Sequence, residues 1–258
     1  MKILRIDRLF FYYIPLLLGG LLNFNWDYFI FSSIFYLIFF QLFMFLNTIT
    51  DIKGDIINKR KTFSFNELKN YIFLNLILLT YMLYINYIYD YFTTNTIYVI
   101  SLYTILGILY HDIIRIKKYY PFNNLLLGTI VSLAFLIGLN KIEYIDLTIF
   151  IGVFFTIVSH YKDIKDIKGD MEDNINTLPI ILKSKLKFYH LMGSIVFVYC
   201  FVFHYYYNKH ISLLYLFIYY TFSTILFNIN KIKILNKKEW YLYIIVILAF
   251  ILFYDYLN

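Results

Sequence analysis

Two short segments of the chain, one in each half, carry the same acidic pattern. The pentapeptide Asp-Ile-Lys-Gly-Asp occurs at 51–55 and again at 166–170, and a threonine, Thr62 or Thr177, follows each copy by seven residues. Each copy comes shortly after a long apolar stretch. The match indicates an internal repeat that presents carboxylates at two corresponding points of the fold.

The spacing of the polar residues in both segments suits a metal site. On a helix, residues three or four apart share one face. Two rows of oxygen-bearing side chains have this spacing: Asn47, Asp51 and Asp55 in the first segment, and Asp163, Asp166 and Asp170 in the second. Mg2+ prefers oxygen ligands and commonly binds through one or two carboxylates plus the phosphates of a substrate. The two rows therefore predict a Mg2+ clamp for a diphosphate.

A structural interpretation competes with this one. The acidic segments also contain Lys53, Lys165 and Lys168, and in this interpretation both are solvated helix ends whose lysines neutralise the acids. Only 15% of the residues are charged. Two matched acidic segments in such a chain favour the metal site.

A third polar connection, 110–118, supplies cations. Arg115, Lys117 and Lys118 lie close together in it. Arg and Lys side chains bind phosphate oxygens through charge-assisted hydrogen bonds. The pattern fits a phosphate site, and it equally fits a basic loop that only marks the cytoplasmic side of a membrane protein. Both interpretations stay open on these residues alone.

Nine apolar stretches separate the polar connections and set the fold class. They cover roughly 9–22, 28–46, 68–89, 96–110, 122–140, 144–160, 188–207, 210–228 and 240–256. Strands of a membrane barrel alternate apolar and polar residues over ~10 residues, whereas these stretches are continuously apolar. Several approach the ~20 residues that a membrane-spanning helix needs. We predict an all-α, polytopic membrane protein of about nine transmembrane helices, with 1–258 forming a single domain.

The basic residues indicate the orientation, because Lys and Arg tend to stay on the cytoplasmic side. Of the 23 Lys and Arg residues, 21 fall on alternate connections, and only Lys141 and Lys209 fall on the others. The N-terminus is therefore expected in the cytoplasm and the C-terminus outside. The acidic connections, at about 47–62 and 161–179, then face the cytoplasm from the cell membrane.

The composition excludes several classes of protein. Hydrophobic residues make up 61% of the 258 residues, against about 45–50% in soluble domains, which excludes an ordinary soluble enzyme and a disordered chain. The net charge of +7 resides in short loops with no continuous basic face, so no nucleic-acid partner is expected. Cys200 is the only cysteine and excludes an intrachain disulfide. No A-x-A-like cleavage site follows the first apolar stretch, so we expect this stretch to be retained.

The first acidic segment resembles a motif of the UbiA superfamily of intramembrane prenyltransferases. The family motif reads N-D-x-x-D-x-x-x-D and is usually followed by I-N-K-P. Asn47, Asp51, Asp55 and the tripeptide 57–59 match it, while Thr48 replaces the first aspartate. Some branches of the family relax that aspartate, so we interpret Thr48 as variation within the family.

The second segment and the third connection extend the resemblance. The family's second motif reads K-D-I-x-D-x-x-G-D followed by T-L-P, and 162–170 and 177–179 match it at every specified position. In the family's L-Y-S-P-P-L-R-L-K loop, Tyr110, Arg115 and Lys117 keep the spacing. This second motif is similar to that of archaeal enzymes that attach a geranylgeranyl chain to geranylgeranylglyceryl phosphate, and to that of the homogentisate and chlorophyll branch.

The resemblance implies a reaction and the residues that perform it. The reaction is Mg2+-dependent transfer of a polyprenyl group from a prenyl diphosphate to a lipid or aromatic acceptor in the membrane, with geranylgeranylglyceryl phosphate as one candidate. The implied catalytic metal ligands are Asn47, Asp51 and Asp55 for one ion, and Asp166 and Asp170, with Asp163 nearby, for another. The implied diphosphate-binding residues are Arg115, Lys117, Lys162 and Tyr110.

Two other functions use similar residues. A membrane terpene cyclase of the same superfamily ionises the same diphosphate without an external acceptor. A transporter of divalent cations places acidic residues within membrane spans, but the apolar stretches here hold almost none. Prenyl transfer accounts for both motifs and is the predicted activity. The sequence sets neither the acceptor, the prenyl chain length nor the oligomeric state.

Overall fold

The computed structural model describes residues 6–23, 25–50, 56–57, 64–111, 116–142, 145–159, 163, 167–182 and 185. The chain divides into two compact units, Met1–Ile181 and Leu182–Asn258, and the first unit carries the helices described below. The described residues form helices and no strand. The all-α prediction is therefore confirmed for this part of the chain.

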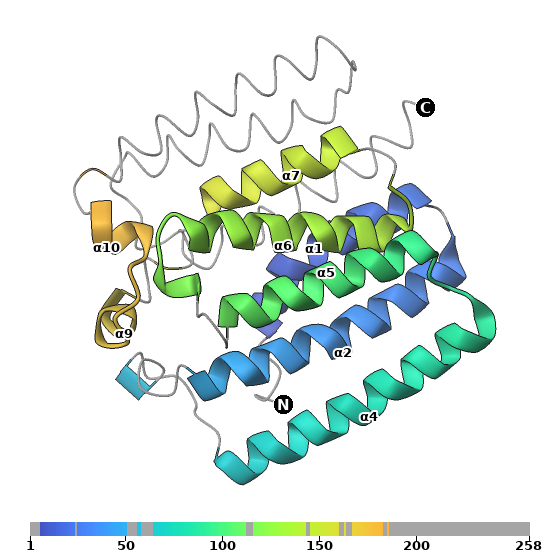
Figure 1. Cartoon of the computed structure of the whole chain (residues 1–258), viewed down its shortest axis with the longest axis horizontal. Helices are drawn as coiled ribbons and strands as arrows, with labels where there is room; N and C mark the ends of the chain where they lie inside the picture. The colour runs from blue at the N-terminus through green and yellow to red at the C-terminus, as the bar shows by residue number, and fades with distance from the viewer. Residues whose placement is uncertain are drawn as a thin grey trace. The chain divides into compact units, whose positions relative to one another are not determined.

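Six long helices match the first six predicted stretches (Figure 1). They are α1 (Ile6–Asn23), α2 (Trp26–Thr50), α4 (Phe65–Tyr89), α5 (Thr94–His111), α6 (Phe122–Leu139) and α7 (Ile145–Val158). Three short helices lie between or after them: η1 (Ile116–Lys118), α9 (Ile167–Glu172) and α10 (Leu178–Leu182). The stretches at 188–207, 210–228 and 240–256 lie outside the described residues, so the count of nine and the orientation of the N-terminus stay predictions.

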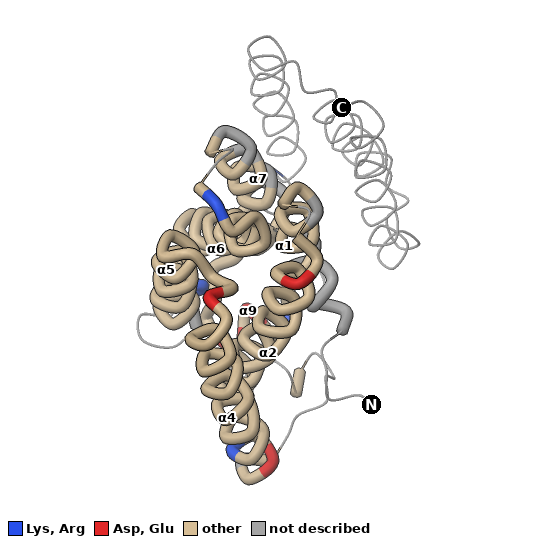
Figure 2. The backbone as a smooth tube through the Cα atoms, turned by 90° about the vertical axis from the view of Figure 1, so that its right-hand side faces the viewer, with Lys and Arg blue, Asp and Glu red and all other residues tan. Residues whose placement is uncertain are grey.

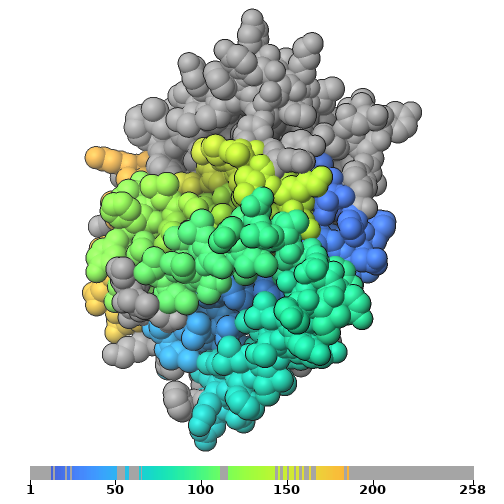
Figure 3. Space-filling view, turned by 45° about the vertical axis from the view of Figure 1, so that its right-hand side comes forward, coloured from blue at the N-terminus to red at the C-terminus, as the bar shows by residue number. Residues whose placement is uncertain are grey.

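Three helices of the described part are long and apolar enough to cross a membrane: Trp26–Thr50, Asn66–Tyr89 and Phe122–Leu139. Helix α4 leaves most of its large apolar side chains uncovered, and Figure 3 shows it along the outside of the viewed face. Phe73, for example, is 66% exposed and Tyr87 is 82% exposed. An apolar face of this extent is a liability in water, whereas lipid tails are as apolar as the side chains themselves.

Glycines let α6 approach its two neighbours closely. A Cβ atom at Gly138 would lie 2.1 Å from the Leu16 carbonyl oxygen on α1, and one at Gly19 would lie 2.1 Å from the Phe135 carbonyl oxygen. On the side of α7, a Cβ atom at Gly128 would lie 2.4 Å from the Gly152 carbonyl oxygen. Small residues at such contacts are typical of membrane helices, which gain stability from close backbone packing.

This packing predicts that Gly138→Ala destabilises the protein far more than Gly152→Ala. The added methyl at 138 meets backbone, which cannot move aside, and overpacking of this kind costs about 1–3 kcal/mol or more. At Gly152 the nearest atom is the Ser132 Cβ at 3.3 Å, so a small shift accommodates the methyl. Thermal unfolding of the two purified variants in the same detergent measures the difference. Equal midpoints would contradict the close contact between α1 and α6.

The alternation of helix direction brings the polar connections to one end of the bundle. In Figure 1, the C-terminal ends of α2, α5 and α7 lie on the same side as the N-terminal ends of α4 and α6. The short helices η1, α9 and α10 lie on that side as well. In Figure 2, the charged residues that are coloured lie near the ends of the helices, and the residues between them are uncharged. The described parts of the two acidic segments, the last turn of α2 and the helix α9, therefore lie at the same end.

Candidate functional site

The structure describes half of the predicted site residues. Those described are Asn47, Tyr110, Lys117, Asp163 and Asp170. Those outside the described residues are Asp51, Asp55, Arg115, Lys162 and Asp166.

Lys117 of η1 reaches the last turn of α2. Its Nζ atom donates hydrogen bonds to Asn47 Oδ1 at 3.2 Å and to Thr50 Oγ1 at 3.0 Å. Lys117 and Asn47 are each only 5% exposed. Burying an ammonium group is costly unless it is hydrogen-bonded, so these two oxygens help to hold the charge in place. The third connection and the first acidic segment thus meet, although Lys117 and Asn47 are 70 residues apart.

The same short helix contacts the second acidic segment through its backbone. The amide of Asn176 donates a hydrogen bond to the Lys118 carbonyl at 3.1 Å. Asn176 follows α9, and the chain between them turns back on itself because the Ile175 amide donates to the Asp170 carbonyl at 2.7 Å. We call the pair of links made by Lys117 and Lys118 the η1 bridge. It ties both acidic segments to one element of three residues.

The second segment presents two acidic side chains and a buried hydroxyl at this end of the bundle. Asp163 is 9% exposed and Asp170 is half-buried. Thr177, which is 4% exposed, has an Oγ1 atom with no hydrogen-bond partner among the described residues. Buried hydroxyls are normally paired, so an oxygen-rich ligand such as a diphosphate fits the site chemically.

A metal cluster is not visible within the described ranges. No group of three or more His, Cys, Asp or Glu side chains capable of holding a metal ion occurs there. Three carboxylates of the expected clamp, Asp51, Asp55 and Asp166, lie outside those ranges. The metal-ligand assignment therefore stays a prediction.

Thr48, which stands where the related motif has its first aspartate, is engaged within its own helix. Its hydroxyl donates to the Met44 carbonyl at 2.8 Å, and the residue is only 2% exposed. A threonine hydroxyl commonly makes this bond to the carbonyl four residues earlier. The Thr48 hydroxyl is therefore paired within the last turns of α2, from which Asn47 and Thr50 contact Lys117.

Tyr120 follows η1 and precedes α6. Burial raises the pKa of the Tyr120 hydroxyl above its ordinary value. The phenol is therefore protonated and uncharged at physiological pH. It adds no negative charge to the connection that carries Lys117 and Lys118.

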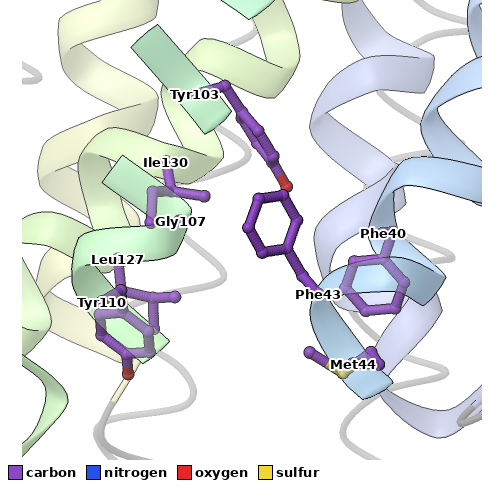
Figure 4. Close-up of a pocket in the computed structure, with 8 residues that line it drawn as sticks. All are labelled: Phe40, Phe43, Met44, Tyr103, Gly107, Tyr110, Leu127 and Ile130. Carbon is purple, nitrogen blue, oxygen red and sulfur yellow. The ribbon is translucent and has the colours of Figure 1, made fainter. Parts of the chain in front are cut away.

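An apolar pocket lies one helical turn deeper in the bundle than Asn47. Its volume is about 30 Å³, and Figure 4 shows side chains from α2, α5 and α6 around it. The lining residues are Phe40, Phe43, Met44, Tyr103, Gly107, Tyr110, Leu127 and Ile130. Tyr110, which the sequence marked as a diphosphate residue, thus lies in the wall of a hydrocarbon pocket and is 7% exposed.

The sequence marked neither Thr50 nor the pocket. Thr50 is recognisable only by its contact with Lys117, because a threonine at the end of an apolar stretch is common. The pocket residues had no distinguishing signal in a chain that contains 29 Tyr and 28 Phe residues. Spacing alone would have placed Phe43 and Asn47 on one face of a helix.

Apolar helices with polar residues at their ends, among them a buried lysine beside the end of α2, define an integral membrane protein with its candidate site at one end of the helices. The chain belongs to the UbiA prenyltransferase family, whose model matches residues 9–243. The resemblance inferred from the two motifs is thereby confirmed, and the enzyme class is prenyltransferase.

Solved structures agree with this family in fold. A UbiA homolog from Archaeoglobus fulgidus bound to DMAPP and Mg2+ has 15% identity and a TM-score of 0.69, with 97% of this chain and 98% of that chain covered. The structure of a UbiA homolog from the same organism bound to GPP and Mg2+ has 15% identity and a TM-score of 0.66, with 97% of this chain and 97% of that chain covered. A digeranylgeranylglyceryl phosphate synthase has 18% identity and a TM-score of 0.63, covering 97% of this chain and 95% of that one. A search of curated proteins found no match to the sequence.

Proposed function

We propose that the chain transfers a prenyl group from a prenyl diphosphate to a hydrophobic or amphiphilic acceptor, a lipid or an aromatic molecule, and releases diphosphate. The observation that carries the proposal is the buried Lys117 ammonium, 3.2 Å from Asn47 Oδ1, one turn above an apolar pocket. A cation beside hydrocarbon suits a ligand that is an anion at one end and an alkyl chain at the other.

The reaction breaks the C–O bond between the prenyl carbon and the diphosphate, and the electron pair leaves with the diphosphate. A carbon or oxygen atom of the acceptor forms a bond to the prenyl carbon and loses a proton. Positive groups fixed in advance stabilise the charge that develops on the leaving group. We assign this role to Lys117, whose position is held by Asn47 and Thr50, together with Arg115 and Lys162.

The donor set of the two segments fits Mg2+. The proposed ligands are Asn47, Asp51 and Asp55 on one side and Asp166 and Asp170 on the other, with Asp163 nearby. Bound there, Mg2+ supplies neutralising charge at the diphosphate. An amide oxygen has two lone pairs, so the hydrogen bond from Lys117 to Asn47 Oδ1 leaves room for a metal bond. The A. fulgidus homolog, bound to Mg2+ with DMAPP or GPP, supports this assignment.

The proposal extends to the acceptor and to the orientation in the membrane. The second motif and the similar digeranylgeranylglyceryl phosphate synthase favour geranylgeranylglyceryl phosphate as the first acceptor to test. The alternation of basic connections places the acidic segments on the cytoplasmic face of the cell membrane. The diphosphate would then arrive from, and return to, the cytoplasm.

Diphosphate release tests the function directly. Purified protein in lipid receives geranylgeranyl diphosphate, GPP or DMAPP with a panel of acceptors, in Mg2+ or in EDTA, and mass spectrometry follows the lipid product. We expect release that requires Mg2+ and is accompanied by a prenylated acceptor. Release without an adduct would favour a cyclase, and no release with any donor would contradict the proposal.

A further inference from the structure

The geometry points to Phe43 and Tyr103 as the residues that set the length of the prenyl chain, so that this protein accepts short donors in preference to long ones. The inference rests on the proposed function, because it concerns the donor of that reaction. Four observations carry it: the place of the pocket, its lining, the support of its floor and its size.

The pocket lies where the hydrocarbon of a bound donor begins. Phe43 and Asn47 are four residues apart on α2, on one face and about 6 Å apart along the axis. On α5, Tyr103, Gly107 and Tyr110 also share one face by their spacing of four and three. A diphosphate held at Lys117 and Asn47 therefore has its first carbon atoms beside this wall.

The lining of the pocket selects for hydrocarbon. None of its eight residues carries a charge, and four of them present aromatic rings from α2 and α5, namely Phe40, Phe43, Tyr103 and Tyr110 (Figure 4). Leu127 and Ile130 of α6 complete the apolar wall. Such a surface gains from contact with an alkyl chain and offers a polar acceptor no charged partner.

The deeper side of the pocket is closed by a supported group of rings. The Phe43 ring lies 5.0 Å from Phe39 and 6.0 Å from Tyr103, measured between ring centroids. Tyr103 in turn lies 5.6 Å from Phe39, and its hydroxyl is 3.1 Å from the hydroxyl of Tyr36. Each ring therefore holds the next in position. We call Tyr36, Phe39, Phe43 and Tyr103 the ring floor.

Phe43 has no free space toward α5. A Cβ atom at Gly107 would lie 2.6 Å from the Phe43 ring, so the ring already fills the room that a side chain there would need. Met44, on another wall, has a flexible thioether side chain that adapts to neighbours. A ligand can therefore enlarge the pocket by moving Met44, but it cannot pass the ring floor without displacing Phe43.

The size of the pocket sets the direction of the preference. Its volume of about 30 Å³ gives room for only about two or three water molecules. From Tyr110 to Tyr103 the helix rises only ~10 Å. A short prenyl chain fits after Met44 moves, whereas each added isoprene unit presses further against Phe43 and Tyr103.

Donor binding by the full chain in lipid nanodiscs with Mg2+ tests the inference without an acceptor. The probes are DMAPP, GPP, geranylgeranyl diphosphate and inorganic diphosphate, followed by calorimetry. We expect the wild type to bind GPP at least about tenfold more tightly than geranylgeranyl diphosphate, since a single methylene can produce this discrimination in an apolar pocket. Phe43→Ala should bind geranylgeranyl diphosphate at least about tenfold more tightly than the wild type does, with inorganic diphosphate unchanged.

Phe45→Ala is the matched control. Phe45 is a buried phenylalanine on the same helix, and its ring stacks on Tyr71 of α4 at 5.4 Å, but it does not line the pocket. It should lower thermal stability without changing the order of donor affinities. Should Phe43→Ala fail to fold, Phe43→Leu gives a smaller change in the same direction, and Gly107→Ala should weaken binding of every prenyl donor relative to inorganic diphosphate.

The outcomes separate this inference from the proposed function. If the wild type and folded Phe43 variants bind all three donors in the same order, the ring floor does not select chain length, although donor binding itself would uphold prenyl transfer. If wild-type protein binds no prenyl diphosphate at all, the proposed function fails and the inference fails with it. A preference of the wild type for geranylgeranyl diphosphate would overturn the inference alone.

Discussion

Asp51→Asn and Asp166→Asn should each abolish prenyl transfer while the protein still inserts into the membrane. Each change removes one negative charge from the proposed metal site and leaves the size of the side chain nearly unaltered. Loss of a single group that stabilises developing charge lowers kcat by about 10²–10³-fold, and loss of a metal ligand should reach at least that range. Steady-state diphosphate release at saturating Mg2+ measures the effect.

Asp27→Asn is the control for this comparison. Asp27 lies in the first turn of α2 and is exposed, at the opposite end of the helix from Asn47. The same chemical change there should leave turnover unaltered. Full activity in either Asp51→Asn or Asp166→Asn would remove that residue from the metal site, whereas equal losses in all three variants would point to a general effect of charge.

Lys117→Met should reduce kcat by about hundredfold, because the variant loses the buried ammonium next to the diphosphate. The change also leaves Asn47 Oδ1 without the donor that it has in the wild type, and it removes one of the hydrogen bonds of Thr50 Oγ1. An unpaired buried polar atom costs about 1–3 kcal/mol, so the midpoint of thermal unfolding should fall as well. Paired assays of turnover and unfolding separate the two effects.

The charge and the bridge can be distinguished by two further variants. Lys117→Arg keeps the charge but replaces a compact ammonium with a wider planar group. Compared with Lys117→Met, it should therefore regain only part of the lost thermal stability. It should regain more of the inhibition by inorganic diphosphate, which depends on the charge. Lys118→Met keeps the backbone carbonyl that accepts from Asn176 and should leave both properties near the wild-type values. If Lys117→Met lost stability but not turnover, Lys117 would be a structural residue only.

The positions of the described helices were largely predictable, and the errors have a common cause. The stretch predicted at 28–46 is the core of α2, but the helix continues to Thr50. Its polar last turn is invisible to a search for apolar residues. The helix nevertheless continues through this turn, and the hydroxyls of Thr48 and Thr50 are paired by donating to carbonyls of the same helix.

The start of α4 shows that a local signal was available. The helix begins at Phe65, three residues before the predicted start at 68. Ser64 and Glu67 form a capping box, in which each side chain accepts a hydrogen bond from the backbone of the other. The spacing of serine and glutamate three residues apart predicts such a start, although both residues are polar.

The site was predictable in its residue types and not in its contacts. Repeated carboxylates and a basic connection indicated a diphosphate site before any fold was known. The choice between a phosphate site and a simple basic loop depended on the fold, because Lys117 reaches Asn47 only when α2, α5 and η1 are assembled. Burial of Lys117 favours the phosphate site, since a topological marker has no reason to leave water.

The η1 bridge has a consequence for the behaviour of the protein in different lipids. Membrane helices tilt to match the thickness of the bilayer, at a cost of fractions of a kcal/mol per Å. Lys117 and Lys118, adjacent in a helix of three residues, attach to Asn47 and Asn176. Because Asn47 belongs to α2, a tilt of α2 that moves Asn47 is passed through Lys117 and Lys118 to Asn176. The described ends of the two acidic segments should therefore move together when the thickness of the bilayer changes.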